Sequence, residues 1–241
     1  MIKGLLFDLN GTIIDICTNE SDFNVWKITA AFMNYCGVFV EPPELRDKYF
    51  ELNRRQRNEN FEEYPEFDSG RIFNDIIKAR CGFEDRSLGN MCSRVFRAAS
   101  RYRLELYDGV RETLEKLSAT CKMAALSDGQ SLWAVPELRA VGAAGFFSFV
   151  MVSGDYGYRK PDSRLFAGAV KKMALPAEDI VFVGNDMYRD VYGAKNAGLK
   201  CIFFKSNQGE QKFCGREPDY IIYDFRQLVE AVDFLSEHSR A

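Results

Sequence analysis

The chain has 241 residues, of which 46% are apolar and 28% are charged, a balance that predicts a packed core and excludes a disordered chain. The formal net charge of −3 gives no general attraction to nucleic acid or to anionic membranes, so neither is expected as a partner. No apolar run approaches the roughly 18 residues of a membrane-spanning helix, and the first residues lack the pattern of a signal peptide, so we expect a cytoplasmic protein.

The first predicted element is a buried strand over residues 2–8, an apolar run that ends at Asp8. The region from 16 to 104 contains no convincing strand but several helical patterns. A block of this length between two strands is too long for an ordinary connection, so it predicts an inserted α-helical subdomain. Its apolar stripes are Phe23, Trp26, Ala30 and Met33; Ile72, Phe73, Ile76 and Ile77; and Val95, Phe96, Ala99 and Tyr102.

Further buried strands are predicted after this block, and helical spacing lies between several of them. The strands are 122–127, 147–153, 179–184, 200–204 and 220–223, and the helical stretches are 111–120, 163–175 and 190–199. Strands that alternate with helices predict an α/β fold with a doubly wound parallel sheet. The core would comprise residues 1–15 and 105–241, with the helical subdomain at 16–104.

Two residue types limit the chemistry of the chain. Its single His, His238, excludes a multi-His metal centre, and a Ser-His-Asp or Cys-His hydrolase would need the tail folded into the site. The seven Cys are widely spread without a C-x-x-C pair, which favours free thiols over a zinc site or a disulfide framework. Any reaction must therefore use carboxylates, Lys, hydroxyl and backbone groups.

Polar side chains stand at the ends of four predicted strands. Asp8 ends the first strand, Ser127 the second, Lys160 follows the third, and Asp186 and Asp190 follow the fourth. In open parallel sheets, ligands bind beyond the carboxyl ends of the strands, near the point where the strand order reverses. We therefore expect these side chains to converge on one crevice.

The combination suits phosphoryl transfer. Facing carboxylates repel each other, and a hard cation with oxygen ligands, usually Mg²⁺, would remove that cost. Asp8 could then act as a nucleophile through its free oxygen, as carboxylates do when they form aspartyl phosphates. Lys160, Ser127 and the cation would meet the charge of the phosphoryl group, together with backbone N–H groups of two turns, Asn10-Gly11-Thr12 and Ser127-Asp128-Gly129.

Four stretches carry a family resemblance. "FDLNGT", "LSDG", "RKPD" and "VGNDMYRDVYGAKNAG" resemble the signature motifs of the haloacid dehalogenase superfamily, in the family's order and with similar spacing. The resemblance covers about 1–15 and 105–225, and the helical block sits where the family's first type of cap domain is inserted. It implies a Rossmann-like core with a helical cap, and a Mg²⁺-dependent phosphatase of a small phosphorylated metabolite. Whether the protein is a monomer or a homodimer is left open.

The resemblance also implies roles for single residues. Asp8 would be the nucleophile and a Mg²⁺ ligand, and the backbone carbonyl of Asn10 a further ligand. Ser127 and Lys160 would bind the phosphoryl group.

The last motif leaves a choice between neighbouring residues. Family members present an acid at the place of Asn185, of Asp186 or of both. Asp186 is the charged residue here and is expected to ligate the metal, with Asn185 open through its amide oxygen or a water molecule. Asp190 would orient Lys160.

Asn10 departs from the family's pattern. The family's phosphatases typically carry an Asp at this position, which protonates the leaving alcohol and then activates water. Such assistance is worth ~10²–10⁴-fold in rate. Asn10 keeps the backbone carbonyl but cannot carry the proton. The enzyme would then prefer acidic leaving groups, turn over slowly, or bind a phosphorylated ligand without hydrolysing it.

A 2-haloacid dehalogenase is the other chemical alternative. It would attack carbon, and its halide leaving group needs no general acid, which suits Asn10. Family dehalogenases, however, carry an aromatic residue at position 10 and lack the metal-binding acid, whereas this chain has Asp186. Phosphoryl chemistry is therefore the favoured prediction.

Overall fold

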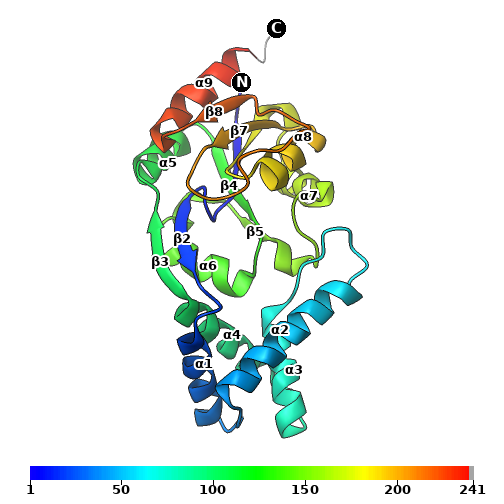
Figure 1. Cartoon of the computed structure of the whole chain (residues 1–241). Coiled ribbons are helices and arrows are strands. Elements are labelled where there is room, and N and C mark those ends of the chain that lie inside the picture. The colour runs from blue at the N-terminus through cyan, green and yellow to red at the C-terminus, as the bar shows by residue number, and fades with distance from the viewer. Residues whose placement is uncertain (239–241) are drawn as a thin grey trace.

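Six parallel strands form the central sheet of the computed structural model, which describes residues 1–238, in the order β5-β4-β1-β6-β7-β8 (Figure 1). All six were predicted, and the α/β class is confirmed. The chain order reverses at β1, which pairs with β4 on one side and β6 on the other. The strands are β1 (Gly4–Phe7), β4 (Lys122–Ser127), β5 (Val150–Val152), β6 (Ile180–Gly184), β7 (Lys200–Phe204) and β8 (Tyr220–Ile222).

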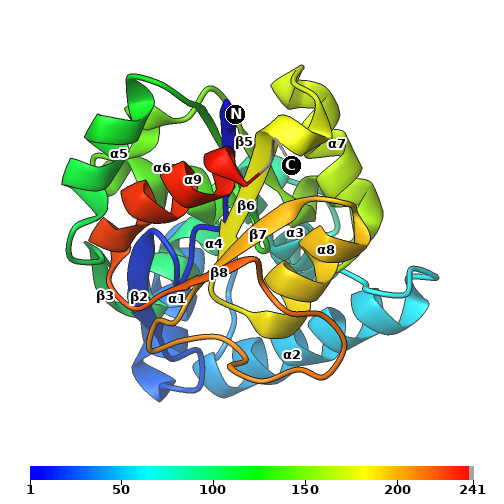
Figure 2. The ribbon, with the colours of Figure 1, turned by 90° about the horizontal axis from the view of Figure 1, so that it is seen from above.

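Helices cover both faces of this sheet. Figure 2 shows α5 and α9 on one side of the strands and α7 and α8 on the other. The bounds are α5 (Val110–Ser118), α6 (Ser131–Ala140), α7 (Ser163–Met173), α8 (Gly193–Asn196) and α9 (Leu228–Glu237), with a π-helical segment at Met187–Tyr192 and short 3-10 helices at Ala144–Phe146, Ser153–Asp155, Ala177–Asp179 and Phe225–Gln227.

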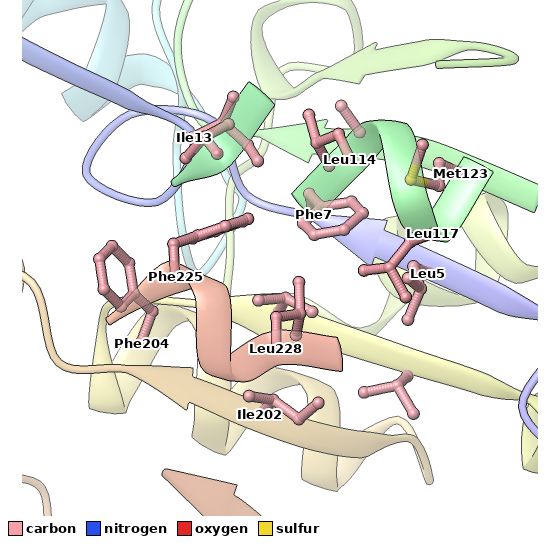
Figure 3. Packing of buried hydrophobic residues seen from close by; sticks show 14 of the residues in the cluster. Leu5, Phe7, Ile13, Leu114, Leu117, Met123, Ile202, Phe204, Phe225 and Leu228 are labelled. Atoms are coloured by element: carbon pink, nitrogen blue, oxygen red, sulfur yellow. The ribbon is translucent and has the colours of Figure 1, made fainter. Parts of the chain in front are cut away.

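The central strand β1 is buried on both faces. Leu5 and Phe7 point to the side of α5 and α9, where they pack with Leu114 and Leu228 (Figure 3). Leu6 points the other way, into the cluster beneath α7 and α8. Successive side chains of a strand alternate between faces, so a strand covered on both sides must be apolar throughout. This explains why the run before Asp8 is continuous.

Helices α1 to α4 form a separate layer below the sheet in Figure 1, with their own apolar cluster. Its large rings are Trp26, Tyr49, Phe73 and Phe96. No helix within residues 1–238 combines the length and apolarity needed to cross a membrane. The bounds are α1 (Phe23–Tyr35), α2 (Pro42–Glu59), α3 (Ser69–Cys81) and α4 (Arg86–Ser100).

The helical layer is joined to α6 of the core. Trp133 of α6 belongs to the apolar cluster of the four helices, and its indole Nε1 donates to Ser93 Oγ over 2.9 Å. Arg97 of α4 donates from Nε to Glu137 Oε1 over 2.7 Å, and its guanidinium stacks over the Trp133 ring. The cluster of α1 to α4 is therefore completed by a core residue.

A two-stranded antiparallel ribbon connects the layers, formed by β2 (Ile14–Thr18) and β3 (Arg101–Leu106). The prediction of no strand between 16 and 104 is therefore wrong at both ends of that region. Tyr102, which was assigned to a helical stripe, lies in β3 and is exposed. The ribbon is half exposed, and its apolar residues alternate with charged ones over few positions, so its period of two is weak.

Candidate active site

The predicted site residues lie at the carboxyl edge of the sheet. Asp8 follows β1, Ser127 ends β4, Lys160 lies in the segment after β5, and Asn185 follows β6. Because β1 pairs with both β4 and β6, the loop after β1 lies between the other two. Lys160 Nζ is 2.6 Å from Asp8 Oδ1, although 152 positions separate the residues.

Lys160 contacts two carboxylates in the interior. Its Nζ is 2.6 Å from Asp8 Oδ1 and 2.6 Å from Asp190 Oδ1, and only 2% of its side chain is exposed. Burial disfavours the ammonium, but Asp190, Asp8 and Asp128 outweigh that effect and raise the pKa of Lys160. The side chain therefore stays charged, and a fixed charge of this kind can meet a phosphoryl oxygen.

Asp190 is held from both sides. Its Oδ1 accepts from Lys160, and its Oδ2 accepts from the backbone N–H groups of Asn185 and Asp186 over 3.0 and 3.1 Å. Burial raises the pKa of Asp190, and Lys160 opposes that shift. A Cβ at Gly184 would come within 2.5 Å of the Asp190 carboxylate, so glycine is required for this approach.

Asn185 packs against the turn that follows Asp8. The Thr12 hydroxyl donates to Asn185 Oδ1 over 3.1 Å and lies 3.5 Å from Asp8 Oδ2. Gly11 has a φ of +90°, and a Cβ there would overlap the Asn185 carboxamide. Of the two neighbours in the last motif, it is thus Asn185 that shares the Thr12 hydroxyl with Asp8.

Backbone N–H groups of the two predicted phosphate turns are largely engaged. Gly11 N–H donates to Ile14 O over 2.8 Å, and Thr12 N–H donates to Leu9 O over 3.2 Å. Gly129 N–H donates to Ser153 Oγ over 2.9 Å. These three N–H groups therefore donate within the protein, and the expectation that N–H groups of the two turns meet an anion stays a prediction.

Asn10, which lies in the same turn, is partly exposed. No hydrogen bond connects its side chain to another residue of the described chain. The amide is therefore free to face a ligand.

The loop after β4 is supported by the helical layer. Ser127 Oγ donates to Asp128 O over 3.3 Å, and Asp128 Oδ1 accepts from Lys160 N–H over 2.9 Å. Ser153, whose hydroxyl accepts from Gly129, donates in turn to Glu66 Oε2 over 2.8 Å. Glu66 lies between α2 and α3, so a side chain of the helical layer supports, through Ser153, the loop that follows Ser127.

Both carboxylate oxygens of Asp186 accept hydrogen bonds, from residues of its own motif and from Glu210. Its Oδ1 accepts from the N–H groups of Tyr188 and Arg189, and its Oδ2 accepts from Glu210 N–H and from Arg189 Nε. Burial opposes ionisation, but Arg189 and these N–H groups hold the pKa of Asp186 below its ordinary value. The carboxylate therefore caps the π-helical segment and binds a guanidinium.

The donor set fits Mg²⁺ poorly. Mg²⁺ is usually held by one or two carboxylates together with substrate phosphates and water. Here Asn10 and Asn185 are uncharged, and the Asp186 and Asp190 oxygens are used by other donors. Among residues 1–238, no three or more His, Cys, Asp or Glu side chains are grouped to hold a metal ion. The assignment of Asp186 as the metal ligand stays a prediction.

Arg189 is the site residue that sequence reasoning missed. Its Nη2 is 2.8 Å from Asp186 Oδ2, and its Nη1 is 3.8 Å from Asp128 Oδ2. The sequence contains one signal for this contact: Arg189 lies three positions after Asp186, at the start of a helical stretch. Side chains three positions apart on a helix lie on the same face and can form an ion pair. That spacing alone did not reveal the contact with the loop after β4.

The helical layer also contacts the segment that carries Lys160. Asn60 Nδ2 donates to Gly157 O over 2.7 Å, Glu66 N–H donates to the same oxygen over 3.0 Å, and Arg159 N–H donates to Tyr64 O over 2.9 Å. Two chain segments, 60–66 and 157–159, therefore run against each other beside the site.

Comparisons with known proteins show which proteins the chain is similar to. Residues 5–204 match the family model described as haloacid dehalogenase-like hydrolase. A glyceraldehyde 3-phosphate phosphatase of Methanocaldococcus jannaschii is 26% identical over 98% of this chain and 100% of its own. A phosphoglycolate phosphatase of Agrobacterium fabrum is 29% identical over 56% of this chain and 61% of its own.

Among solved structures, a 2-haloacid dehalogenase from Pseudomonas syringae pv. Tomato DC3000 aligns with a TM-score of 0.71, at 22% identity, over 97% of this chain and 99% of its own. A phosphatase from Thermococcus onnurineus aligns with a TM-score of 0.61, at 20% identity, over 96% and 98%. At such identities the likeness shows the fold alone.

Proposed function

Because the chain belongs to the haloacid dehalogenase-like hydrolase family, we propose that it hydrolyses phosphate monoesters of small metabolites. The observation that carries the proposal is the buried contact between Asp8 and Lys160 at the sheet edge at which β4 ends with Ser127. The phosphatase names of the similar proteins, among them glyceraldehyde 3-phosphate phosphatase and phosphoglycolate phosphatase, support it.

In the proposed first step, an Asp8 carboxylate oxygen attacks phosphorus. The bond between phosphorus and the ester oxygen breaks, and the leaving oxygen takes a proton from water, because the Asn10 carboxamide has none to give. Lys160 and the Ser127 hydroxyl meet the charge on the phosphoryl oxygens. In the second step, water attacks the phosphorus of the aspartyl phosphate, which releases inorganic phosphate and restores Asp8.

The helical layer, residues 16–104, would act as a cap that closes over the crevice and excludes water. Its support is the contact of residues 60–66 with the segment that carries Lys160, and the hydrogen bond from Ser153 to Glu66. The core would then comprise residues 1–15 and 105–241.

Hydrolysis of p-nitrophenyl phosphate tests the proposal, because its acidic leaving group needs little protonation. We expect turnover by the wild type and a loss of at least about 100-fold in Asp8→Asn, since this change removes the nucleophile. Exposed Asp233→Asn, in α9, serves as the control and should leave the rate unchanged. Absence of turnover in the wild type and in Asn10→Asp would refute the proposed activity.

Attack at carbon is the second candidate, and two observations favour it. Asn10 cannot protonate a leaving group, and the donor set is poor for a divalent cation, but displacement of halide needs neither. Release of halide from 2-chloropropionate, in the absence of phosphatase activity, would select this candidate. Binding of phosphate without release of product in either assay would instead indicate a phospho-ligand binding protein.

A further inference from the structure

Arg189 connects two loops at the edge of the site. It lies in the π-helical segment Met187–Tyr192, after β6. Its Nε and Nη2 are 2.9 and 2.8 Å from Asp186 Oδ2, and its Nη1 is 3.8 Å from Asp128 Oδ2. The guanidinium therefore lies between the loop after β6 and the loop after β4, both of which border Asp8.

The surroundings of this guanidinium are acidic. Asp128 Oδ2 is buried and has no hydrogen-bond partner in the described part of the chain, so the positive charge of Arg189 offsets an otherwise uncompensated oxygen. Burial opposes the charged form of Arg189, but Asp186, Asp190 and Asp8 outweigh this and raise its pKa.

The guanidinium is also open to a ligand. The Arg189 side chain is 40% exposed and lines a cavity of about 330 Å³ together with Asp186, Tyr188, Glu210, Lys212 and Phe213. Two of its nitrogens are fixed on Asp186, which sets the plane of the guanidinium. A planar fork with free N–H groups is the geometry that binds phosphate oxygens in pairs.

A divalent cation would meet unfavourable charges at the same place. Lys160 and Arg189 are both positive, whereas the two positions that could add negative charge beside Asp8 are the neutral Asn10 and Asn185. Repulsion by the fixed cations and the neutral side chains at positions 10 and 185 both weaken such binding.

We propose that the Arg189 guanidinium, held on Asp186, supplies the positive charge that a bound phosphate meets on this side of the site, and that phosphate binds without a divalent cation. The choice of ligand rests on the proposed function. Asp186 is then a positioning residue for Arg189 rather than a metal ligand.

Calorimetric titration with inorganic phosphate in EDTA tests the inference. The wild type should bind phosphate, and replacing EDTA by Mg²⁺ should change its affinity less than about twofold. Arg189→Met should weaken binding about 10- to 100-fold, which corresponds to the loss of a charged hydrogen bond. Arg189→Lys, which keeps the positive charge but not the planar guanidinium, should weaken phosphate binding less than Arg189→Met does. Arg226→Met, which removes an exposed guanidinium far along the chain, is the control and should bind as the wild type does.

A second variant tests whether the neutral side chain at position 185 prevents Mg²⁺ binding. Asn185→Asp adds a negative charge next to the Thr12 hydroxyl that contacts Asp8. Mg²⁺ should raise the melting temperature of Asn185→Asp but leave that of the wild type unchanged, because only in the variant does a second carboxylate lie with Asp8 beside the Thr12 hydroxyl. A Mg²⁺-dependent rise in the wild type would contradict the inference, and this comparison remains decisive if Arg189→Met does not fold.

Other results separate this inference from the proposed function. Phosphate binding that needs Mg²⁺, or that survives unchanged in Arg189→Met, overturns the role of Arg189. Hydrolysis of p-nitrophenyl phosphate only in Mg²⁺ keeps the proposed function and overturns the inference. Phosphate binding in EDTA that is lost in Arg189→Met, in a protein that hydrolyses no ester, supports the inference and removes the proposed hydrolysis.

Discussion

Replacing Lys160 by Met should destabilise the protein strongly. The substitution keeps most of the apolar stem but removes the ammonium from between Asp8 and Asp190, whose side chains are 8% and 1% exposed. Breaking a buried ion pair by removing one partner costs about 3–5 kcal/mol, because the remaining charge is left uncompensated. For a domain of this size, that loss corresponds to a decrease of about 6–20 °C in melting temperature.

A matched control separates burial from distance. Lys3 Nζ is also 2.6 Å from a carboxylate, Asp179 Oδ2, but the Lys3 side chain is 57% exposed. Water screens such a pair, so Lys3→Met should change stability far less than Lys160→Met. Urea unfolding followed by far-ultraviolet circular dichroism measures both free energies of unfolding.

The loss of stability in Lys160→Met should depend on pH in a direction that follows from the pKa of Asp190. Burial raises the pKa of Asp190 in the folded protein, and Lys160 opposes this rise. Without Lys160, the folded state binds the Asp190 proton more tightly than the unfolded state does, so stability increases as pH falls. The loss should be smaller at about pH 5 than at about pH 8. A loss equal to that of Lys3→Met, or one that does not change with pH, would refute the reasoning.

Three further changes test other parts of the site. Asn10→Asp should raise hydrolysis of alkyl phosphates by about 10²–10⁴-fold and of p-nitrophenyl phosphate much less, and equal gains would contradict the role of the proton. Gly184→Ala places a Cβ within 2.5 Å of the Asp190 carboxylate and should cost about 1–3 kcal/mol in urea unfolding, whereas Gly145→Ala, which meets no atom within 4 Å, should be close to neutral. Glu66→Ala removes the acceptor of a buried serine hydroxyl and should cost about 1–3 kcal/mol, with slower p-nitrophenyl phosphate turnover; unchanged stability and rate would separate the insert from the loop that carries Ser127.

The sheet could be predicted because its strands are buried on both faces. Leu5, Leu6 and Phe7 all enter apolar clusters, so the sequence carries a continuous signal, and each strand ends where polar residues begin. The ribbon of β2 and β3 gives no such signal, because half of its side chains face solvent. Its pairing also depends on residues about 90 positions apart, a separation that local periodicity cannot reveal.

The site was predictable in composition but not in its contacts. The order of strand ends placed Asp8, Lys160 and Asp190 together, since parallel strands share one carboxyl edge. The choice between Asn185 and Asp186 depended on the backbone path after β6. There the chain enters the π-helical segment Met187–Tyr192, and the Asp186 carboxylate caps its first turn by accepting hydrogen bonds from backbone N–H groups. Neighbouring positions in a loop carry no periodic signal for such a choice.

The place of Trp133 has a consequence for building chimeras of this protein. The ring is supplied by α6, yet it fills the cluster of the four helices and hydrogen-bonds to Ser93. Transfer of residues 16–104 alone into another protein would leave a cavity at the position of the Trp133 indole. It would also remove Glu137, the carboxylate that pairs with Arg97. Exchange of these helices between relatives would therefore require α6 to be exchanged together with α1 to α4.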